Sequence, residues 1–350
     1  MTDFYASSLA TGTGTGTQAS PWDLAQAVAY TYNANDRLGL IDDGTYTTAA
    51  NITVLLNGNA NVLWTGCTSV IGDSGIATIQ ALSGCTQILI TGHSGLDVAQ
   101  LKLDANSFAT GCISLPYGGS FVNGECLGFS GVAVGSSTGS STTAWRVYCH
   151  SPNGTAATGL QSTSPSSECV FSGLGTGANI GYNNSFLPSR SIFINCGQGI
   201  YCAHAGMYSQ SNTFYNCAIA IQESQGAMSD FFLHNNLIVG STTGIQFSGA
   251  NVVQVIEKYN AFFGNTSNLN YGTPDATDQI LTAGPFVNPG GAVNKLSDAF
   301  VNFALNSTAG GGALCRGAGT PAYLDIGAVQ SAPSGGSSGY PRIVVPRRRY

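Results

Sequence analysis

Four stretches between residues 190 and 270 share one pattern and decide the fold: SIFINCGQGI at 191–200, NTFYNCAIAI at 212–221, NLIVGSTTGI at 236–245 and NAFFGNTSNL at 260–269. Phe193, Phe214, Ile238 and Phe262 hold the same place in each stretch, at steps of 21, 24 and 24 residues. Each stretch reads as a short strand, a turn of Gly, Asn or Ser, and a second apolar piece. The sequence between them shows no pattern for a crossover helix. The repeat therefore predicts a parallel β-helix, in which equivalent residues stack at about 4.8 Å.

The same pattern of short apolar strands and turns continues upstream with less regularity. At about 22–25 residues per coil, the stretch 38–270 would hold roughly ten coils. We therefore predict an all-β chain, a single right-handed parallel β-helix with a short N-terminal cap helix. Stacking would place Cys196 over Cys217 inside the solenoid. We interpret the ten cysteines mostly as small buried core residues, with disulfides as the alternative.

The chain divides into five predicted segments: 1–37, an N-terminal strand and cap helix; 38–272, the β-helix; 273–330, C-terminal coils or cap; 331–339, a flexible linker; and 340–350, a basic and apolar tail. A cap is needed because the end of a β-helix exposes open sheet edges. We expect Ser20 to be the N-cap of the cap helix, Pro21 its first residue, and Asp23 the partner that completes a capping box.

The composition limits the classes of partner. Charged residues make up 8% of the chain, against about 25% in ordinary globular domains. Four of the 11 basic residues lie in the last nine positions, and the seven others stand against 17 acidic residues, a body charge of −10. A general nucleic-acid binder would instead show a basic face. We see no secretory signal, no apolar run that predicts a membrane span, and no Cys/His spacing that predicts a metal or other cofactor.

Motifs near both ends resemble the pectate-lyase-like superfamily of right-handed β-helix repeat proteins: FYAS at 4–7, SPW at 20–22 before the cap helix, DGTY at 43–46, GPFVN at 284–288 and DIGAVQ at 325–330. The resemblance covers about residues 4–330 and implies the fold. It leaves the function open, because this fold hosts lyases, hydrolases, epimerases, adhesins and phage tailspikes.

The sequence offers one candidate catalytic set. Lyases of this superfamily typically use Arg or Lys, often with calcium, but no basic pair holds matching positions in the clear repeat and no acidic cluster suits calcium. The remaining set is His204, Glu223, Glu257 and Lys258. If these side chains faced one groove, they would suit acid–base chemistry on a glycosidic bond; solvated loop residues are the alternative.

Two further groups are candidate contacts. Four tyrosines alternate with interior positions and would form an outward row, either for stacking on sugars or for burial by a neighbouring subunit: Tyr201, Tyr208, Tyr215 and Tyr259. The tail carries a predicted partner anchor, with a solvated end as the alternative: Ile343, Val344 and Val345 between two prolines, with Arg342, Arg347, Arg348 and Arg349.

Three functions follow as alternatives. The first is a non-enzymatic structural surface protein, a virion decoration, fibre or spike-like component of a bacteriophage, with glycans as potential ligands. Low charge, an acidic rod and a tethered tail favour it. The second is a carbohydrate-active enzyme, a polysaccharide lyase or glycoside hydrolase, and the third is a bacterial surface adhesin. We expect a virion-surface or extracellular location, a homo-oligomer with a trimer among the candidates, and other structural subunits bound through the tail.

Overall fold

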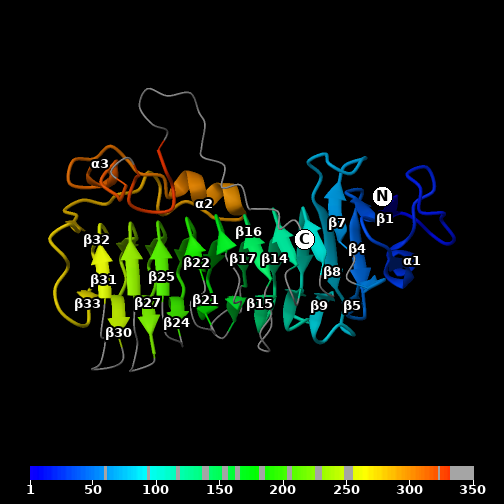
Figure 1. Ribbon diagram of the computed structural model, residues 1–350, viewed down its shortest axis with the longest axis horizontal. Coiled ribbons are helices and arrows are strands. Elements are labelled where there is room, and N and C mark those ends of the chain that lie inside the picture. The colour runs from blue at the N-terminus through cyan, green and yellow to red at the C-terminus, as the bar shows by residue number, and fades with distance from the viewer. Residues whose placement is uncertain are drawn as a thin grey trace.

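The computed structural model describes residues 1–331 apart from 59–60, 93–94, 116–118, 136–141, 152–156, 162–165, 181–185, 203–206, 225–230, 248–254 and 322–323. Over these residues the chain winds into a right-handed parallel β-helix whose strands form three long sheets, named here sheets I, II and III (Figure 1). The predicted solenoid is thus confirmed.

Each coil contributes one strand to each sheet, and the described strands of each sheet follow in stacking order. Sheet I contains β1 (Asp3–Ser7), β3 (Arg37–Ile41), β7 (Val62–Cys67), β10 (Leu96–Ala99), β13 (Ser120–Val122), β16 (Thr143–Trp145), β19 (Ser166–Ser167), β22 (Phe186–Ser189), β25 (Met207–Gln210), β28 (Phe231–His234) and β31 (Val255–Lys258). Sheet II contains β4 (Thr45–Thr48), β8 (Ala77–Ala81), β11 (Leu101–Asp104), β14 (Glu125–Leu127), β17 (Tyr148–His150), β20 (Val170–Ser172), β23 (Ile192–Ile194), β26 (Thr213–Tyr215), β29 (Leu237–Val239), β32 (Ala261–Phe263) and β34 (Gln279–Ile280). Sheet III contains β5 (Ile52–Thr53), β9 (Ile88–Thr91), β12 (Gly111–Ser114), β15 (Val132–Gly135), β18 (Thr158–Gln161), β21 (Thr176–Ile180), β24 (Gln198–Cys202), β27 (Ile219–Glu223), β30 (Thr243–Phe247) and β33 (Ser267–Leu269), while β2 (Thr31–Tyr32) and β6 (Leu55–Leu56) pair separately.

The interior is built from rows of identical positions. Phe193, Phe214, Ile238 and Phe262 pair in register on successive strands of sheet II, and all four are buried. The rings of Phe193 and Phe214 stack with centroids 4.8 Å apart and planes 10° from parallel. The predicted core register is therefore confirmed, and it sets which residues of every strand face outward.

The cysteines belong to this interior. All ten are buried, including Cys196 and Cys217, and burial raises the pKa of the Cys217 thiol well above its usual value. The interpretation of the cysteines as core residues is confirmed, because desolvation of the thiolate keeps such thiols protonated.

An asparagine ladder closes the turn between sheets I and II. The side-chain oxygens of Asn212, Asn236 and Asn260 accept the backbone N–H of Ser191, Asn212 and Asn236, at 3.0, 3.2 and 2.9 Å. Asp278 takes the next rung, where its carboxylate accepts the N–H of Asn260 at 2.8 Å. The ladder satisfies buried N–H groups that the turn leaves outside the sheets.

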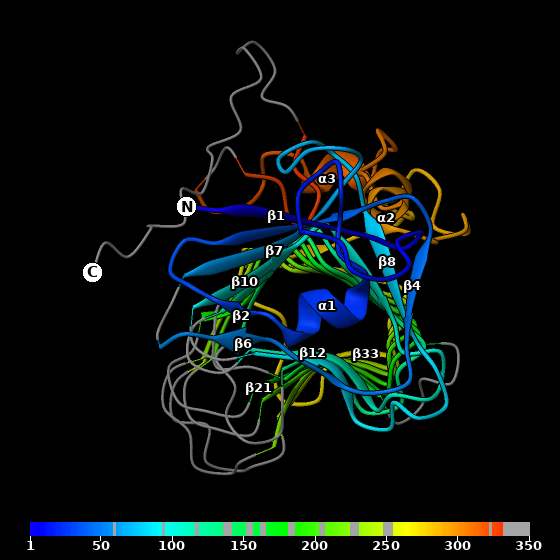
Figure 2. The ribbon, with the colours of Figure 1, turned by 90° about the vertical axis from the view of Figure 1, so that its right-hand side faces the viewer.

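The N-terminal cap is confirmed, with one correction to its boundary. Helix α1 (Leu24–Ala29) lies across the end of the interior (Figure 2). Its N-cap is Asp23 rather than Ser20: the Asp23 carboxylate accepts the N–H of Gln26, and the Gln26 side chain accepts the N–H of Asp23. The helix begins at Leu24, three residues later than predicted, because Asp23 and Gln26 complete the capping box by themselves.

The C-terminal segment covers a side of the solenoid. After β34 the chain returns along the outer face of sheet II and forms α2 (Leu296–Asn302) and α3 (Gly312–Cys315) (Figure 1). Phe286 and Phe303 pack on Tyr215, and the Tyr148 hydroxyl donates to the carbonyl of Val293 at 2.8 Å. This second apolar core buries the outer face of sheet II.

Candidate functional site

The three described members of the predicted catalytic set do not face one groove. His204 lies outside the described residues. Glu223 is 1% exposed and pairs in register with Cys202 and Phe247, which are also buried, so its side chain occupies an interior row. The prediction of a groove-facing Glu223 is wrong, because the inward and outward positions of β27 follow the stacking of neighbouring coils rather than residue polarity.

Glu257 and Lys258 are consecutive residues of β31 and point to opposite faces. Glu257 aligns with Leu233, which is buried, whereas Lys258 aligns with His234 on the outer face. The Glu257 carboxyl group accepts the side-chain N–H of Asn260 at 2.8 Å and neighbours the carboxyl group of Asp278. Burial and the adjacent carboxyl group raise the pKa of Glu257 to about 8. Glu257 therefore belongs to the end of the ladder.

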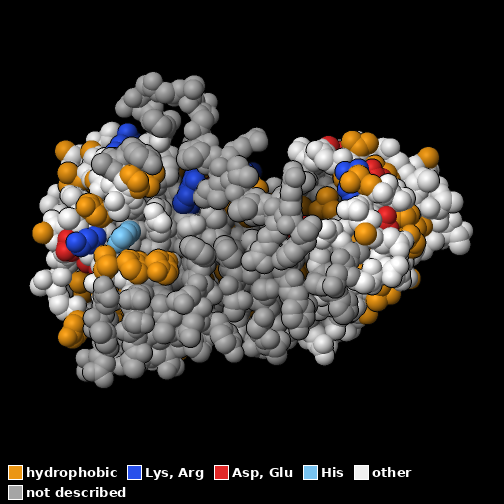
Figure 3. All heavy atoms as spheres, in the orientation of Figure 1, with side chains coloured by type: hydrophobic (Ala, Val, Ile, Leu, Met, Phe, Trp, Pro, Cys, Tyr) orange, Lys and Arg blue, Asp and Glu red, His pale blue; other side chains and the backbone are white. Residues whose placement is uncertain are grey.

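The four tyrosines do not form one row. Tyr201 lies on sheet III, Tyr208 on sheet I, Tyr215 beneath the C-terminal segment on sheet II, and Tyr259 at a turn with φ of 57°. A shorter outward row exists on sheet I, where Tyr208, Phe232 and Ile256 pair on successive strands. We name these three residues the apolar stripe; it shows as a band of hydrophobic side chains over β25, β28 and β31 (Figure 3).

A charged stack stands at the turn from sheet I to sheet II. Arg146, Glu168 and Arg190 occupy the same turn position on three successive coils, with φ of 55°, 55° and 51°. The Glu168 carboxylate lies 4.0 Å from Arg146 Nε and 3.5 Å from Arg190 Nη2. The Arg190 Nε atom is buried and has no hydrogen-bond partner. We name these three residues the turn stack. The sequence did not reveal it, because Arg146 lies outside the clear repeat.

A polar row lies one position before the turn stack in each strand and runs toward the C-terminal end of sheet I. Gln210, His234 and Lys258 pair on successive strands and face outward. Burial and the positive charge of Lys258 lower the pKa of His234, so its imidazole is neutral near pH 7. Its Nε2 atom is buried and has no hydrogen-bond partner in the described part of the chain. The polar row therefore carries a neutral imidazole next to a cation.

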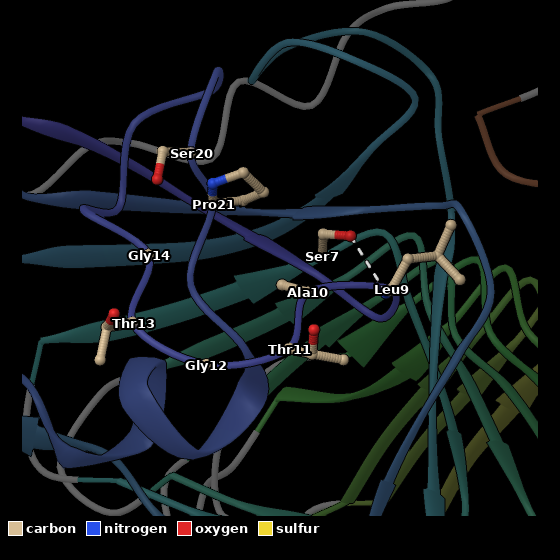
Figure 4. A pocket seen from close by; sticks show the side chains of 9 residues that line it. All are labelled: Ser7, Leu9, Ala10, Thr11, Gly12, Thr13, Gly14, Ser20 and Pro21. Carbon is tan, nitrogen blue, oxygen red and sulfur yellow. Dashed lines mark hydrogen bonds between the residues drawn. The ribbon is translucent and has the colours of Figure 1, made fainter.

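Two hollows of the described surface are less suited to chemistry than this edge of sheet I. One, of about 440 Å³, is lined at the N-terminal loop by uncharged residues between Ser7 and Pro21 (Figure 4). The Ser7 hydroxyl in it donates to Asp43 at 2.5 Å and accepts the N–H of Leu9. The other, of about 390 Å³, lies over β3, β7, β10 and β13, where Arg37 is paired with Asp3 at 2.6 Å.

None of the described helices is long and apolar enough to cross a membrane. Among the described His, Cys, Asp and Glu side chains, no group of three or more gathers to hold a metal ion.

The architecture defines the chain as a right-handed parallel β-helix protein. The sequence matches no family model and no curated protein. Among solved structures, the fold is similar to that of pectate lyase Pel9A, with 12% identity, a TM-score of 0.61, and coverage of 95% of this chain and 97% of that one. A rhamnogalacturonan lyase matches at 13% identity and a TM-score of 0.28 over 75% of this chain and 74% of that one. The first likeness establishes the fold, and neither supports the expected phage component.

Proposed function

We propose that the protein is carbohydrate-active and binds an acidic polysaccharide along the turn stack and the polar row. One observation carries this proposal. Although the body has a net charge of −10 with seven basic residues, Arg146, Arg190 and Lys258 lie along one edge of sheet I. A basic line on an acidic rod attracts a linear polyanion, whereas a neutral partner gains no such attraction and a cationic one is repelled there.

The spacing of the basic line suits a polymer. Arg146 and Arg190 are two coils apart, about 10 Å, and Lys258 lies three coils beyond, about 14 Å more, since strands stack at about 4.8 Å. A guanidinium group binds a carboxylate through two parallel N–H bonds. An extended chain of uronate sugars lying parallel to the solenoid axis would therefore meet successive cations.

Of the two enzymatic chemistries predicted from the sequence, elimination fits this edge better than hydrolysis. Hydrolysis needs two carboxyl groups that face each other across the glycosidic bond. Here Glu168 is held between two arginines and Glu257 faces the ladder. In an elimination, Arg190 would neutralise the uronate carboxylate and neutral His234 would take the proton from the adjacent carbon. The C–O bond to the leaving sugar breaks as the C=C bond forms, and the leaving oxygen takes a proton from water.

Binding to polygalacturonate and to neutral galactan, measured by titration calorimetry, tests the proposal. Arg190→Ala should weaken polygalacturonate binding about tenfold or more, because a charged hydrogen bond contributes about 1.5–3 kcal/mol. Arg37→Ala, which removes the same charge at the far end of sheet I, is the matched control and should change it less than about twofold. Equal effects of both substitutions, or equal binding of galactan, would contradict the proposal.

Formation of an unsaturated product, followed by ultraviolet absorbance, tests the elimination step. His234→Ala should abolish product formation and leave binding within about threefold. Product formation that survives His234→Ala would show that another group removes the proton.

A further inference from the structure

Trp145 is an exposed aromatic side chain on the edge of sheet I. It is the last residue of β16 and directly precedes Arg146 of the turn stack. The preceding residue, Ala144, is buried, whereas Trp145 is 37% exposed, so the indole points outward. The sequence did not reveal its position, because β16 lies outside the clear repeat.

The indole lies in line with the polar row. Trp145 pairs with Ser167, Ser167 with Ser189, and Ser189 with Gln210, the first residue of the polar row. One line of outward positions therefore runs from Trp145 to His234. The two residues are four coil steps apart, about 19 Å, since strands stack at about 4.8 Å.

The neighbours of Trp145 in this line are small on one side. Val122 precedes it, and Ser167 and Ser189, both half-buried, follow it. The Ser189 hydroxyl donates to that of Ser167 at 3.3 Å. Toward the C-terminal end, the next large side chain of this line is therefore Gln210, three coil steps from the indole.

The apolar stripe differs from Trp145 in this respect. Tyr208 is 43% exposed, but its ring stacks on that of Phe232 with centroids 4.7 Å apart and planes 6° from parallel. These two rings cover each other's faces. Among the described residues, no aromatic ring stacks on the indole of Trp145 in this way.

An indole in this position suits a sugar ring. The faces of a pyranose carry C–H groups with partial positive charge, which pack on the negative face of an aromatic ring. The hydroxyl groups of Ser167 and Ser189 add polar contacts for the sugar hydroxyls. Arg146, next to the indole, supplies a guanidinium group for the carboxylate of a uronate.

We propose that Trp145 is the stacking platform for one uronate ring at the N-terminal end of the binding edge. The inference rests on the proposed function and adds a subsite that holds the polymer by apolar contact as well as by charge. Because about 19 Å separate the platform from His234, Trp145 binds and positions the chain and does not contact the bond that breaks.

Tryptophan fluorescence tests the platform on the full chain. The other two tryptophans are buried, since Trp22 is 9% exposed and Trp64 is 0% exposed. Adding polygalacturonate should therefore quench or blue-shift the emission of Trp145 alone. Trp145→Phe should remove this response while calorimetry still detects binding.

Affinity provides the second readout. Trp145→Ala should weaken polygalacturonate binding about fivefold at low and at physiological salt, because stacking is little screened, whereas the effect of Arg190→Ala should shrink as salt rises. Tyr271→Ala is the matched control. It removes an aromatic ring that is 63% exposed just after β33, and it should change the affinity less than about twofold.

The outcomes distinguish the platform from the proposed function. Calorimetric binding with unchanged fluorescence, or binding by Trp145→Ala within about twofold of wild type, would overturn the platform and leave the proposed function standing. If the wild-type protein bound no polygalacturonate in calorimetry, the proposed function and the platform would both be overturned.

Discussion

Replacing Glu168 by Gln should tighten binding of an acidic polysaccharide. Glu168 lies 3.5 and 4.0 Å from the guanidinium groups of Arg190 and Arg146, so it neutralises part of the charge that a ligand would meet. The substitution keeps the shape of the side chain and removes its charge. If Glu168 instead bound the ligand directly, the same substitution would weaken binding.

The magnitude follows from the geometry of the turn stack. A ligand carboxylate on the far side of Arg190 would lie about 7 Å from the Glu168 carboxylate, a repulsion of about 2 kcal/mol at an effective dielectric constant near 20. Screening at physiological salt reduces this to about 1 kcal/mol, or about fivefold in affinity. The free energy of unfolding should fall by at most about 1 kcal/mol, because the ion pairs are partly exposed.

The assay is calorimetric titration of polygalacturonate into wild type, Glu168→Gln and Asp97→Asn, at low and at physiological salt. Asp97 is an exposed acid on the same sheet near its other end, so its replacement controls for the net charge. The gain for Glu168→Gln should shrink as salt rises. Weaker binding by Glu168→Gln, or an equal gain from Asp97→Asn, would refute the assignment of the binding edge to the turn stack.

Three further predictions concern the fold. Phe214→Ala should lower the free energy of unfolding by about 3–5 kcal/mol in denaturant titrations, since the ring is buried in a stacked row; a loss below about 1 kcal/mol would contradict the packing. Asn236→Asp should cost at least about 2 kcal/mol, because an oxygen replaces the amide nitrogen that donates to Asn260; an unchanged midpoint would count against the ladder. The raised pKa of Glu257 contributes stability that is complete below about pH 4.5 and is lost as pH rises through about 8, so stability should fall across that range and Glu257→Gln should flatten the fall. Parallel curves for wild type and variant would rule this out.

The interior could be predicted from the sequence because stacking makes it repetitive. Phe193 and Phe214 occupy one row, and the row demands similar side chains on each coil. Cys196 and Cys217 follow for the same reason. The same types of side chain thus recur at equivalent buried positions of neighbouring coils, and this recurrence is visible in the sequence.

The outer surface does not repeat, and so the site could not be predicted. Arg146, Glu168 and Arg190 are brought together by register alone, across coils whose loops differ in length. Glu223 was predicted to face outward because it is charged, but its side chain is buried in an interior row. The polarity of a residue indicates whether its side chain points inward or outward only where the alternation of the strand is already known.

The outward side chains differ among the three sheets, and this difference indicates which face can bind a charged ligand. On sheet II the outward row includes Tyr148, Val170 and Ile192, and the C-terminal segment buries it. On sheet III the described outward side chains include uncharged amides, with Gln198 donating to Gln222. Sheet I and its turn carry Arg146, Arg190, His234 and Lys258 on outward positions. Because a polyanion must be held by charge, the edge of sheet I is the face on which the proposed function depends, and a fold built for mechanical rigidity alone would have no need to gather its sparse cations there.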